Sequence, residues 1–190
     1  MIELNHTFVT SDHHFRDWKN CPLHEGSEED EAQRIALWNS VVGKDDLVLY
    51  VGDFYESVPV TCQGGVADLQ DLLGKLNGQI VLIKGNHDKM DDSVYRLAFK
   101  DVVPEMRIEE ANLLLVHVPD RAKLRPGERM IYGHEHRGYV PLPTTRDSIC
   151  VCAKWHGWKP LTIAEAIRQM DAVLPKNIND YKAVKDLQLT

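Results

Sequence analysis

In this sequence, polar clusters directly follow the short apolar runs, and this pattern limits the folds that the chain can adopt. Five of these runs pass directly into clusters rich in aspartate, asparagine or histidine. These clusters are Asp12-His13-His14, Gly52-Asp53, Gly85-Asn86-His87-Asp88, His117 and Gly133-His134-Glu135-His136. Strand ends in an α/β fold collect at one edge of a sheet, so the loops that follow them converge on a crevice. The pattern therefore predicts that five separate segments build one site.

Between these clusters, β-rich runs alternate with amphipathic segments, which predicts a mixed α/β domain. We predict strands over residues 7–10, 46–51, 79–84, 112–118, 129–132 and 148–153. A capping-box pattern at Ser27 predicts a helix from Glu28 to about Val42. A leucine stripe that ends at Asn77-Gly78 predicts a second helix, and the same capping pattern at Thr162 predicts a third.

The size and composition of the chain indicate one soluble globular domain. Its 190 residues are 43% apolar and 27% charged, which excludes global disorder. We expect this domain to span residues 1–174, followed by a polar C-terminal extension over residues 175–190. The first residues lack a basic segment followed by an apolar stretch, and no apolar run reaches the roughly 20 residues that cross a bilayer. We therefore expect a cytoplasmic protein without a membrane partner.

Charge and cysteine content exclude two classes of protein. The chain has 22 Lys and Arg against 29 Asp and Glu, a net charge of −7, so we expect no stable binding to duplex nucleic acid. Its four cysteines form no Cys-x-x-Cys pair, which argues against a structural zinc site or a redox motif. The nine histidines, in contrast, are more than packing needs.

Seven side chains at the strand ends have the chemistry of metal ligands. They comprise two carboxylates, one amide oxygen and four imidazoles: Asp12, His14, Asp53, Asn86, His117, His134 and His136. Such a mixture of oxygen and nitrogen suits Mn²⁺, Fe or Zn²⁺ better than Ca²⁺ or Cu(I). Seven ligands are too many for one such ion, so we expect two divalent ions that share a bridging carboxylate.

In chain order, these clusters resemble the calcineurin-like metallophosphoesterase family. The family pattern reads Asp-x-His, Gly-Asp, Gly-Asn-His-Asp/Glu, His and Gly-His-x-His, and every block is present between Asp12 and His136. The resemblance implies an α/β fold of four layers, αββα, in which two mixed β-sheets pack face to face between helices. It also implies a dinuclear site. One metal would be held by Asp12, His14 and His136, the other by Asn86, His117 and His134, and Asp53 would bridge them.

The same resemblance assigns His87 and Asp88 to catalysis rather than to metal binding. His87 would contact the substrate and either stabilise the phosphorane or protonate the leaving oxygen, and an imidazole with an unperturbed pKa of about 6.5 is suited to giving a proton. Asp88 would fix the orientation of the His87 ring or act through neighbouring groups. A hydroxide that bridges the two ions would attack phosphorus.

Small phosphodiesters are the expected substrates, in particular 2′,3′- or 3′,5′-cyclic nucleotides. Phe54 follows Gly52-Asp53 where Ser/Thr protein phosphatases have an Asp-Arg-Gly extension, and Asp88 replaces their Glu. The similarity is to small stand-alone bacterial and phage-type phosphoesterases. The main alternative is a phosphomonoesterase that acts on nucleotides or sugar phosphates. A protein phosphatase, a nuclease and a non-catalytic metal-binding scaffold are favoured less. Manganese is the expected metal, with Fe, Zn or Ni as alternatives, and a homodimer is left open.

Several residues near the motifs have two interpretations each. His117 alone would fit a hydrogen-bonded strand histidine, but its place between two motif blocks favours a ligand. We expect His13 at the edge of the site, because alternate residues of an extended chain face opposite sides. The tryptophans of Trp155-His156-Gly157-Trp158 fit either a cover for the core edge or a platform for a base. Four further residues could contact substrate or lie on the solvated surface: Arg16, Trp18, Arg137 and Tyr139.

Overall fold

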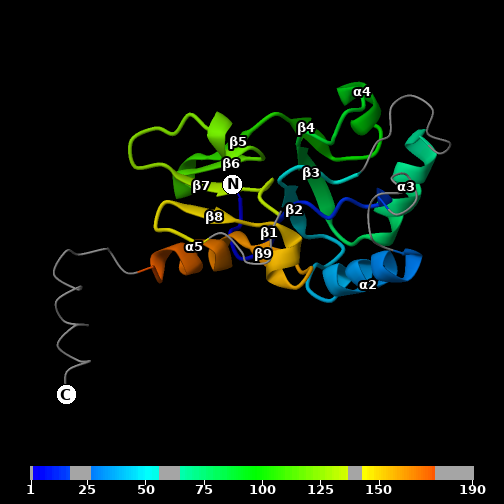
Figure 1. Ribbon diagram of the computed structural model, residues 1–190, viewed down its shortest axis with the longest axis horizontal. Coiled ribbons are helices and arrows are strands. Elements are labelled where there is room, and N and C mark those ends of the chain that lie inside the picture. Colours follow the sequence, from blue (N-terminus) through cyan, green and yellow to red (C-terminus); the bar gives the residue numbers. More distant parts are fainter. Residues whose placement is uncertain (1, 18–26, 56–64, 137–142, 174–190) are drawn as a thin grey trace, which may run out of the picture.

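A computed structural model describes residues 2–17, 27–55, 65–136 and 143–173, and shows two mixed β-sheets flanked by helices (Figure 1). The first sheet has the order β4-β3-β2-β1-β9. Its strands are β1 (Thr7–Thr10), β2 (Leu47–Tyr50), β3 (Gln79–Ile83), β4 (Asp101–Val103) and β9 (Leu161–Thr162). Strands β1 to β4 pair in parallel, and β9 is antiparallel to β1.

The second sheet has the order β5-β6-β7-β8. Its strands are β5 (Met106–Ile108), β6 (Leu113–Val116), β7 (Arg129–Tyr132) and β8 (Ser148–Cys150). Strands β6, β7 and β8 are parallel, and β5 is antiparallel to β6. The helices are α2 (Glu28–Asn39), α3 (Gly65–Lys75), α4 (Asp92–Tyr95) and α5 (Ile163–Asp171), with 3₁₀ turns η1 (Glu109–Ala111), η2 (Pro119–Arg121) and η3 (Ala153–His156).

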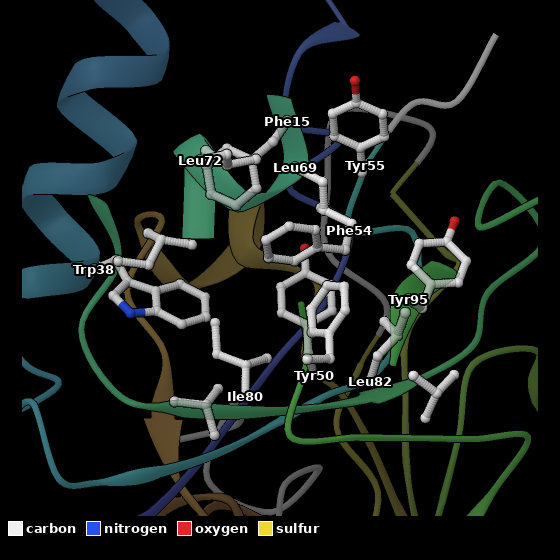
Figure 2. Close-up of a cluster of buried hydrophobic side chains, with 14 of the residues drawn as sticks. Phe15, Trp38, Tyr50, Phe54, Tyr55, Leu69, Leu72, Ile80, Leu82 and Tyr95 are labelled. Carbon is white, nitrogen blue, oxygen red and sulfur yellow. The ribbon is translucent and has the colours of Figure 1, made fainter. Parts of the chain in front are cut away.

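Strand β2 is buried on both faces, and its side chains alternate between two apolar cores. Val48 and Tyr50 contact the helices α2, α3 and α4, whereas Leu49 and Val51 face the second sheet. Figure 2 shows Tyr50 and Phe54 at the centre of the first core, with Trp38 from α2 and leucines from α3 around them. The second core lies between the sheets, and α5 closes it with Ile163, Ala166 and Met170. On the far side of the second sheet, Trp155 of η3 packs against Tyr132 and Cys150.

The predicted fold class is confirmed by this arrangement of two mixed sheets and flanking helices. All six predicted strands are present, and β1 and β7 have the predicted bounds. The capping box at Ser27 forms, and the Thr162 side chain caps α5 at the Glu165 amide. Helix α2 ends at Asn39 rather than near Val42, because the chain turns at Ser40 toward Gly43.

Three strands are additions to the prediction. Strands β4, β5 and β9 have only three, three and two residues, too few to establish a period-2 pattern in the sequence. The proposed C-terminal extension over residues 175–190 lies outside the described residues. Among the helices that the structure describes, none has the length and apolar character needed to cross a membrane.

Candidate metal centre

The predicted ligands come together where strands of both sheets end. Strands β1, β2 and β3 deliver Asp12, Asp53 and Asn86 with their neighbours, and β6 and β7 of the second sheet deliver His117 and the His134 segment. The two sheets are joined at this edge, since Ser11 pairs with Cys152 just beyond β8. Parallel neighbours end at the same side of a sheet, which is why segments far apart in sequence meet here.

The backbone at the site is held in an uncommon conformation. Four predicted ligands have positive φ angles: Asp12 at 56°, His14 at 47°, Asp53 at 56° and His134 at 72°. Left-handed conformations are unfavourable for residues with a Cβ and persist only where surrounding structure imposes them. Their concentration in one place indicates a functional site.

Glycine is required at two close backbone approaches. A Cβ on Gly85 would lie 2.2 Å from Asp53 Oδ1, and one on Gly133 would lie 2.7 Å from Asp12 Oδ2. Neither position has room for a side chain, because the neighbouring atom is a carboxylate held in the site. The glycines of the Gly-Asn-His-Asp and Gly-His-x-His blocks therefore let the loops close around the two carboxylates.

Asp12, His14, Asp53 and His136 form the first group of converging donor atoms. One ligand atom from each lies within 4.8 Å of the others. The Nε2 atoms of His14 and His136 are 3.2 Å apart, and His14 Nε2 is 3.8 Å from Asp53 Oδ2. Two imidazoles and two carboxylates that converge in this way have the chemistry of a divalent metal site.

Asp53, His117 and His134 form the second group. His117 Nδ1 lies 2.8 Å from the Val51 carbonyl, to which it donates, and its Nε2 is 3.1 Å from Asn86 Oδ1. A neutral histidine that donates a hydrogen bond from Nδ1 to a carbonyl has an unprotonated Nε2, and this nitrogen can bind metal.

Asp53 belongs to both groups. Its Oδ1 accepts a hydrogen bond from the His87 amide at 2.8 Å, whereas its buried Oδ2 accepts none. His117 Nε2 lies 3.2 Å from this Oδ2, and His14 Nε2 lies 3.8 Å from it. A buried carboxylate oxygen without a donor is costly unless a cation compensates it, so the donor set fits divalent metal.

Comparisons with known proteins agree with this geometry. Residues 6–162 match the calcineurin-like phosphoesterase family. The chain belongs to this family. An uncharacterized protein of Methanocaldococcus jannaschii is 26% identical over 193 residues, which cover 94% of this chain and 99% of that protein.

Two solved structures are similar to this phosphoesterase in fold. A protein of unknown function from Aquifex aeolicus has a TM-score of 0.60 at 18% identity, covering 85% of this chain and 97% of that one. The nuclease MPE of Pseudomonas putida has a TM-score of 0.50 at 22% identity, covering 73% of this chain and 68% of that one. Such low identities show a shared fold alone.

The two carboxylates of the phosphoesterase site have different electrostatic surroundings. Burial raises the pKa of Asp12 to about 6, and the neighbouring imidazoles only partly offset this. Burial also acts to raise the pKa of Asp53, but the contact with His117 and the His87 amide outweigh it and hold the pKa at about 2. Of the two carboxylates, Asp53 is therefore the one that loses its proton more readily.

His87 lies on the wall of a hollow beside the metal ligands. The hollow has a volume of about 190 Å³ and is lined by Asp53, Asn86, His87, His134, Glu135 and His136. The His87 and His14 rings meet edge to face with centroids 5.1 Å apart. This location suits a group that contacts a bound ester. Glu135, the variable residue of the Gly-His-x-His block, is a wall residue that the sequence pattern does not identify.

Asp88 is buried and holds two loops together. Its Oδ2 accepts hydrogen bonds from the Asp53 and Gly85 amides, each at 2.8 Å, and its Oδ1 accepts one from the Phe54 amide at 3.0 Å. The resemblance implies that Asp88 fixes the orientation of the His87 ring or acts through neighbouring groups, and its carboxylate accepts these three hydrogen bonds from backbone amides. They make Asp88 a positioning residue for the loops that carry Asp53 and His87.

The flanking residues have structural roles where they are described. Arg16 is buried and pairs with Glu31 at 2.6 Å and Asp71 at 2.8 Å, so neither substrate contact nor solvent exposure describes it. His13 is buried among aromatic rings, with its centroid 4.9 Å from that of Phe15, and it also lines a hollow beside Asp12 and His14, so it lies next to the predicted ligands without joining either donor group. Trp18, Arg137 and Tyr139 lie outside the described residues.

Proposed function

We propose that this protein is a dinuclear-metal-dependent phosphodiesterase that hydrolyses small phosphodiesters such as 2′,3′- or 3′,5′-cyclic nucleotides. Family membership implies a hydrolase that acts on phosphoesters. The observation that carries the dinuclear proposal is Asp53 Oδ2, a buried oxygen that accepts no hydrogen bond and is common to two groups of converging donors. Asp12, His14 and His136 would hold one ion, Asn86, His117 and His134 would hold the other, and Asp53 would be the ligand common to both.

When bound, two divalent ions supply an ionised water for attack on phosphorus and positive charge for the phosphate oxygens. The chain's own residues complete the chemistry. The Nε2 atom of His117 is free of a proton and can bind metal, because the ring proton lies on Nδ1 and is hydrogen-bonded to the Val51 carbonyl. His87, on the wall of the hollow, donates a proton to the departing oxygen. Asp88 holds together the loops that carry Asp53 and His87, because it accepts hydrogen bonds from the Asp53 and Gly85 amides.

Glu135 supports a diester rather than a monoester as substrate. Glu135 is one of the residues that line the hollow, together with His87. A phosphomonoester carries close to two negative charges near pH 7, whereas a diester carries one. A carboxylate beside the bound ester repels the dianion more strongly. We expect Mn²⁺ to support activity, with Fe, Zn or Ni as alternatives that share the same ligand chemistry.

Rates on paired substrates test this proposal. The protein is treated with a chelator, reloaded with Mn²⁺, and assayed on 2′,3′-cyclic AMP and on AMP. We expect activity only after reloading, with a higher kcat/KM on the diester, and about two ions per chain by metal analysis. Asp53→Asn should lose activity, and Asp45→Asn, a change at an exposed aspartate before β2, is the matched control. Full activity in the chelated protein would refute the metal mechanism, and a preference for AMP would favour the monoesterase.

A further inference from the structure

A second hollow adjoins the metal centre and is not used by the proposed chemistry. It also has a volume of about 190 Å³, and His136 lines both hollows. Its walls combine the metal ligands Asp12 and His14 with Arg34, Lys154 and Trp158. A substrate bound at the metals can therefore extend past His136 into a space with two cationic side chains.

Arg34, on helix α2, is half-buried and held flat against an aromatic ring. Its guanidinium carbon is 4.0 Å from the centroid of the Trp158 ring, and its Nη1 donates to the His13 carbonyl at 3.2 Å. No ion pair joins Arg34 to a carboxylate within the described residues, although Asp17, Asp30 and Glu31 attract it at longer range. The guanidinium donates to one carbonyl and contacts no carboxylate directly among the described residues, so it has further N–H groups to offer an anionic ligand.

Trp158 is fixed as the support for Arg34. Its backbone has a φ of 63°, and its amide donates to the Ala153 carbonyl at 2.8 Å. One face of the ring is covered by the guanidinium, so the base-platform interpretation of this tryptophan is disfavoured. Burial lowers the pKa of Arg34, but a guanidinium stays protonated at neutral pH.

Lys154, in the turn η3, is exposed on the same hollow and adds a second positive charge. Its Nζ lies 4.7 Å from the centroid of the Trp155 ring. Asp17 is the acidic residue on this wall besides Asp12, whose charge serves the metal. With Asp12 assigned to the metal, Arg34 and Lys154 are the cationic residues of this wall and Asp17 is its remaining carboxylate.

We propose that this second hollow binds a further phosphate group of the substrate, held by Arg34 and Lys154 while the scissile diester lies at the Asp53 centre. This inference rests on the proposed function, because it places the scissile ester in the first hollow. A guanidinium presents paired N–H groups that match phosphate oxygens, and an ammonium acts as a point charge beside it. The preferred substrates are therefore nucleotides that carry a phosphate in addition to the diester that is cleaved.

Kinetics on a matched pair of substrates test the subsite. The pair is adenosine 2′,3′-cyclic phosphate with and without a 5′-phosphate, assayed with the Mn²⁺-loaded protein. We expect kcat/KM to be about tenfold higher or more with the 5′-phosphate, as for a charge-assisted hydrogen bond. Arg34→Gln should reduce this ratio to below about twofold, and Lys154→Gln should reduce it in part. Arg34→Lys keeps the positive charge but lacks the paired N–H groups of the guanidinium, so it should retain part of the preference for the 5′-phosphate. Arg168→Gln, at an exposed arginine of α5, is the control that keeps the wild-type ratio.

Equilibrium binding separates failure of the subsite from failure of the proposed function. Calorimetry compares adenosine 3′,5′-bisphosphate with adenosine 3′-monophosphate, which requires no turnover. A roughly tenfold tighter binding of the bisphosphate that disappears in Arg34→Gln supports the subsite even if no diester is hydrolysed. Equal binding of the two ligands by the wild-type protein overturns the subsite. So does an Arg34→Gln protein that binds and hydrolyses both members of each pair with the wild-type ratio.

Discussion

At the scale of single residues, His87 is the side chain whose loss should separate chemistry from metal binding. It lines the hollow but belongs to neither group of converging donors. We expect His87→Ala to keep the wild-type metal content and to lower kcat on 2′,3′-cyclic AMP by about 10² to 10⁴, as removal of a general acid does. His6→Ala, at an exposed histidine, is the control. Wild-type kcat in His87→Ala would remove this residue from the mechanism.

Gly85 makes a second prediction at this scale, because the space beside it is occupied by a metal ligand. A Cβ there would lie 2.2 Å from Asp53 Oδ1 and 2.4 Å from the Asp53 amide nitrogen. We expect Gly85→Ala to weaken Mn²⁺ binding at least tenfold and to destabilise the fold by about 1–3 kcal/mol.

Gly74→Ala is the matched control, since Gly74 lies in α3 with nothing within 4 Å of the added carbon. That change should stabilise the protein by about 0.5–1 kcal/mol. Metal titration and urea unfolding measure both effects, and equal behaviour of the two variants would contradict the steric explanation.

The sequence predicts the role of a residue when that residue belongs to a motif of adjacent positions. Asp53 and His134 each follow a glycine at a strand end, and the order of the five motif blocks predicts both as ligands. Arg34 cannot be found in this way, since its role depends on Trp158 from a distant turn packing against α2. The role of Arg16 is hidden for the same reason, because its partners on α2 and α3 are brought to it only by the fold.

At the scale of elements, the buried ion pairs of Arg16 connect the loop after β1 to helices α2 and α3. Arg16 and Glu31 are both buried and meet at 2.6 Å, and Glu31 also accepts the Arg16 amide at 2.8 Å. Removing the guanidinium takes the neighbouring cation away from a buried carboxylate, which is costly. We expect Arg16→Met to lower the free energy of unfolding by about 3–5 kcal/mol.

A surface pair provides the control for this prediction. Arg125 and Glu109 form an ion pair at 2.8 Å, with more than half of each side chain exposed, at 54% and 69%. Exposed pairs of this kind contribute at most about 1 kcal/mol, so Arg125→Met should have a small effect on urea unfolding. Similar losses in both variants would show that the Arg16 network does not hold the loop to the helices.

The elements themselves are predictable where they are long or have a capping signal. Helix α5 begins at Thr162 as its capping pattern indicates, and α2 begins after Ser27 for the same reason. The short edge strands β4, β5 and β9 owe their existence to pairing with a neighbour, so their residues alone carry little signal.

At the scale of the whole molecule, the predicted metal ligands lie where the two sheets meet. Donors at the ends of β1 and β2 belong to the first sheet, and donors at the ends of β6 and β7 belong to the second. A ligand that binds only the folded arrangement stabilises it by mass action, by about 2.7 kcal/mol at a concentration 100 times its Kd. The net charge of −7 also favours the metal-bound protein, because a negatively charged protein attracts cations.

Thermal unfolding should therefore depend strongly on metal. We expect Mn²⁺ at about 100 times its Kd to raise Tm by roughly 5–10 °C over the chelated protein, given 2–4 °C per kcal/mol for domains of this size. Asp53→Asn, which removes the negative charge of the carboxylate common to both groups, should abolish most of this rise, whereas Asp45→Asn should retain it. Scanning calorimetry over a series of Mn²⁺ concentrations measures the shift. A Tm that is the same with chelator and with Mn²⁺ would mean that the two sheets are held by their apolar core alone. The donors at their common edge would then contribute nothing to the fold.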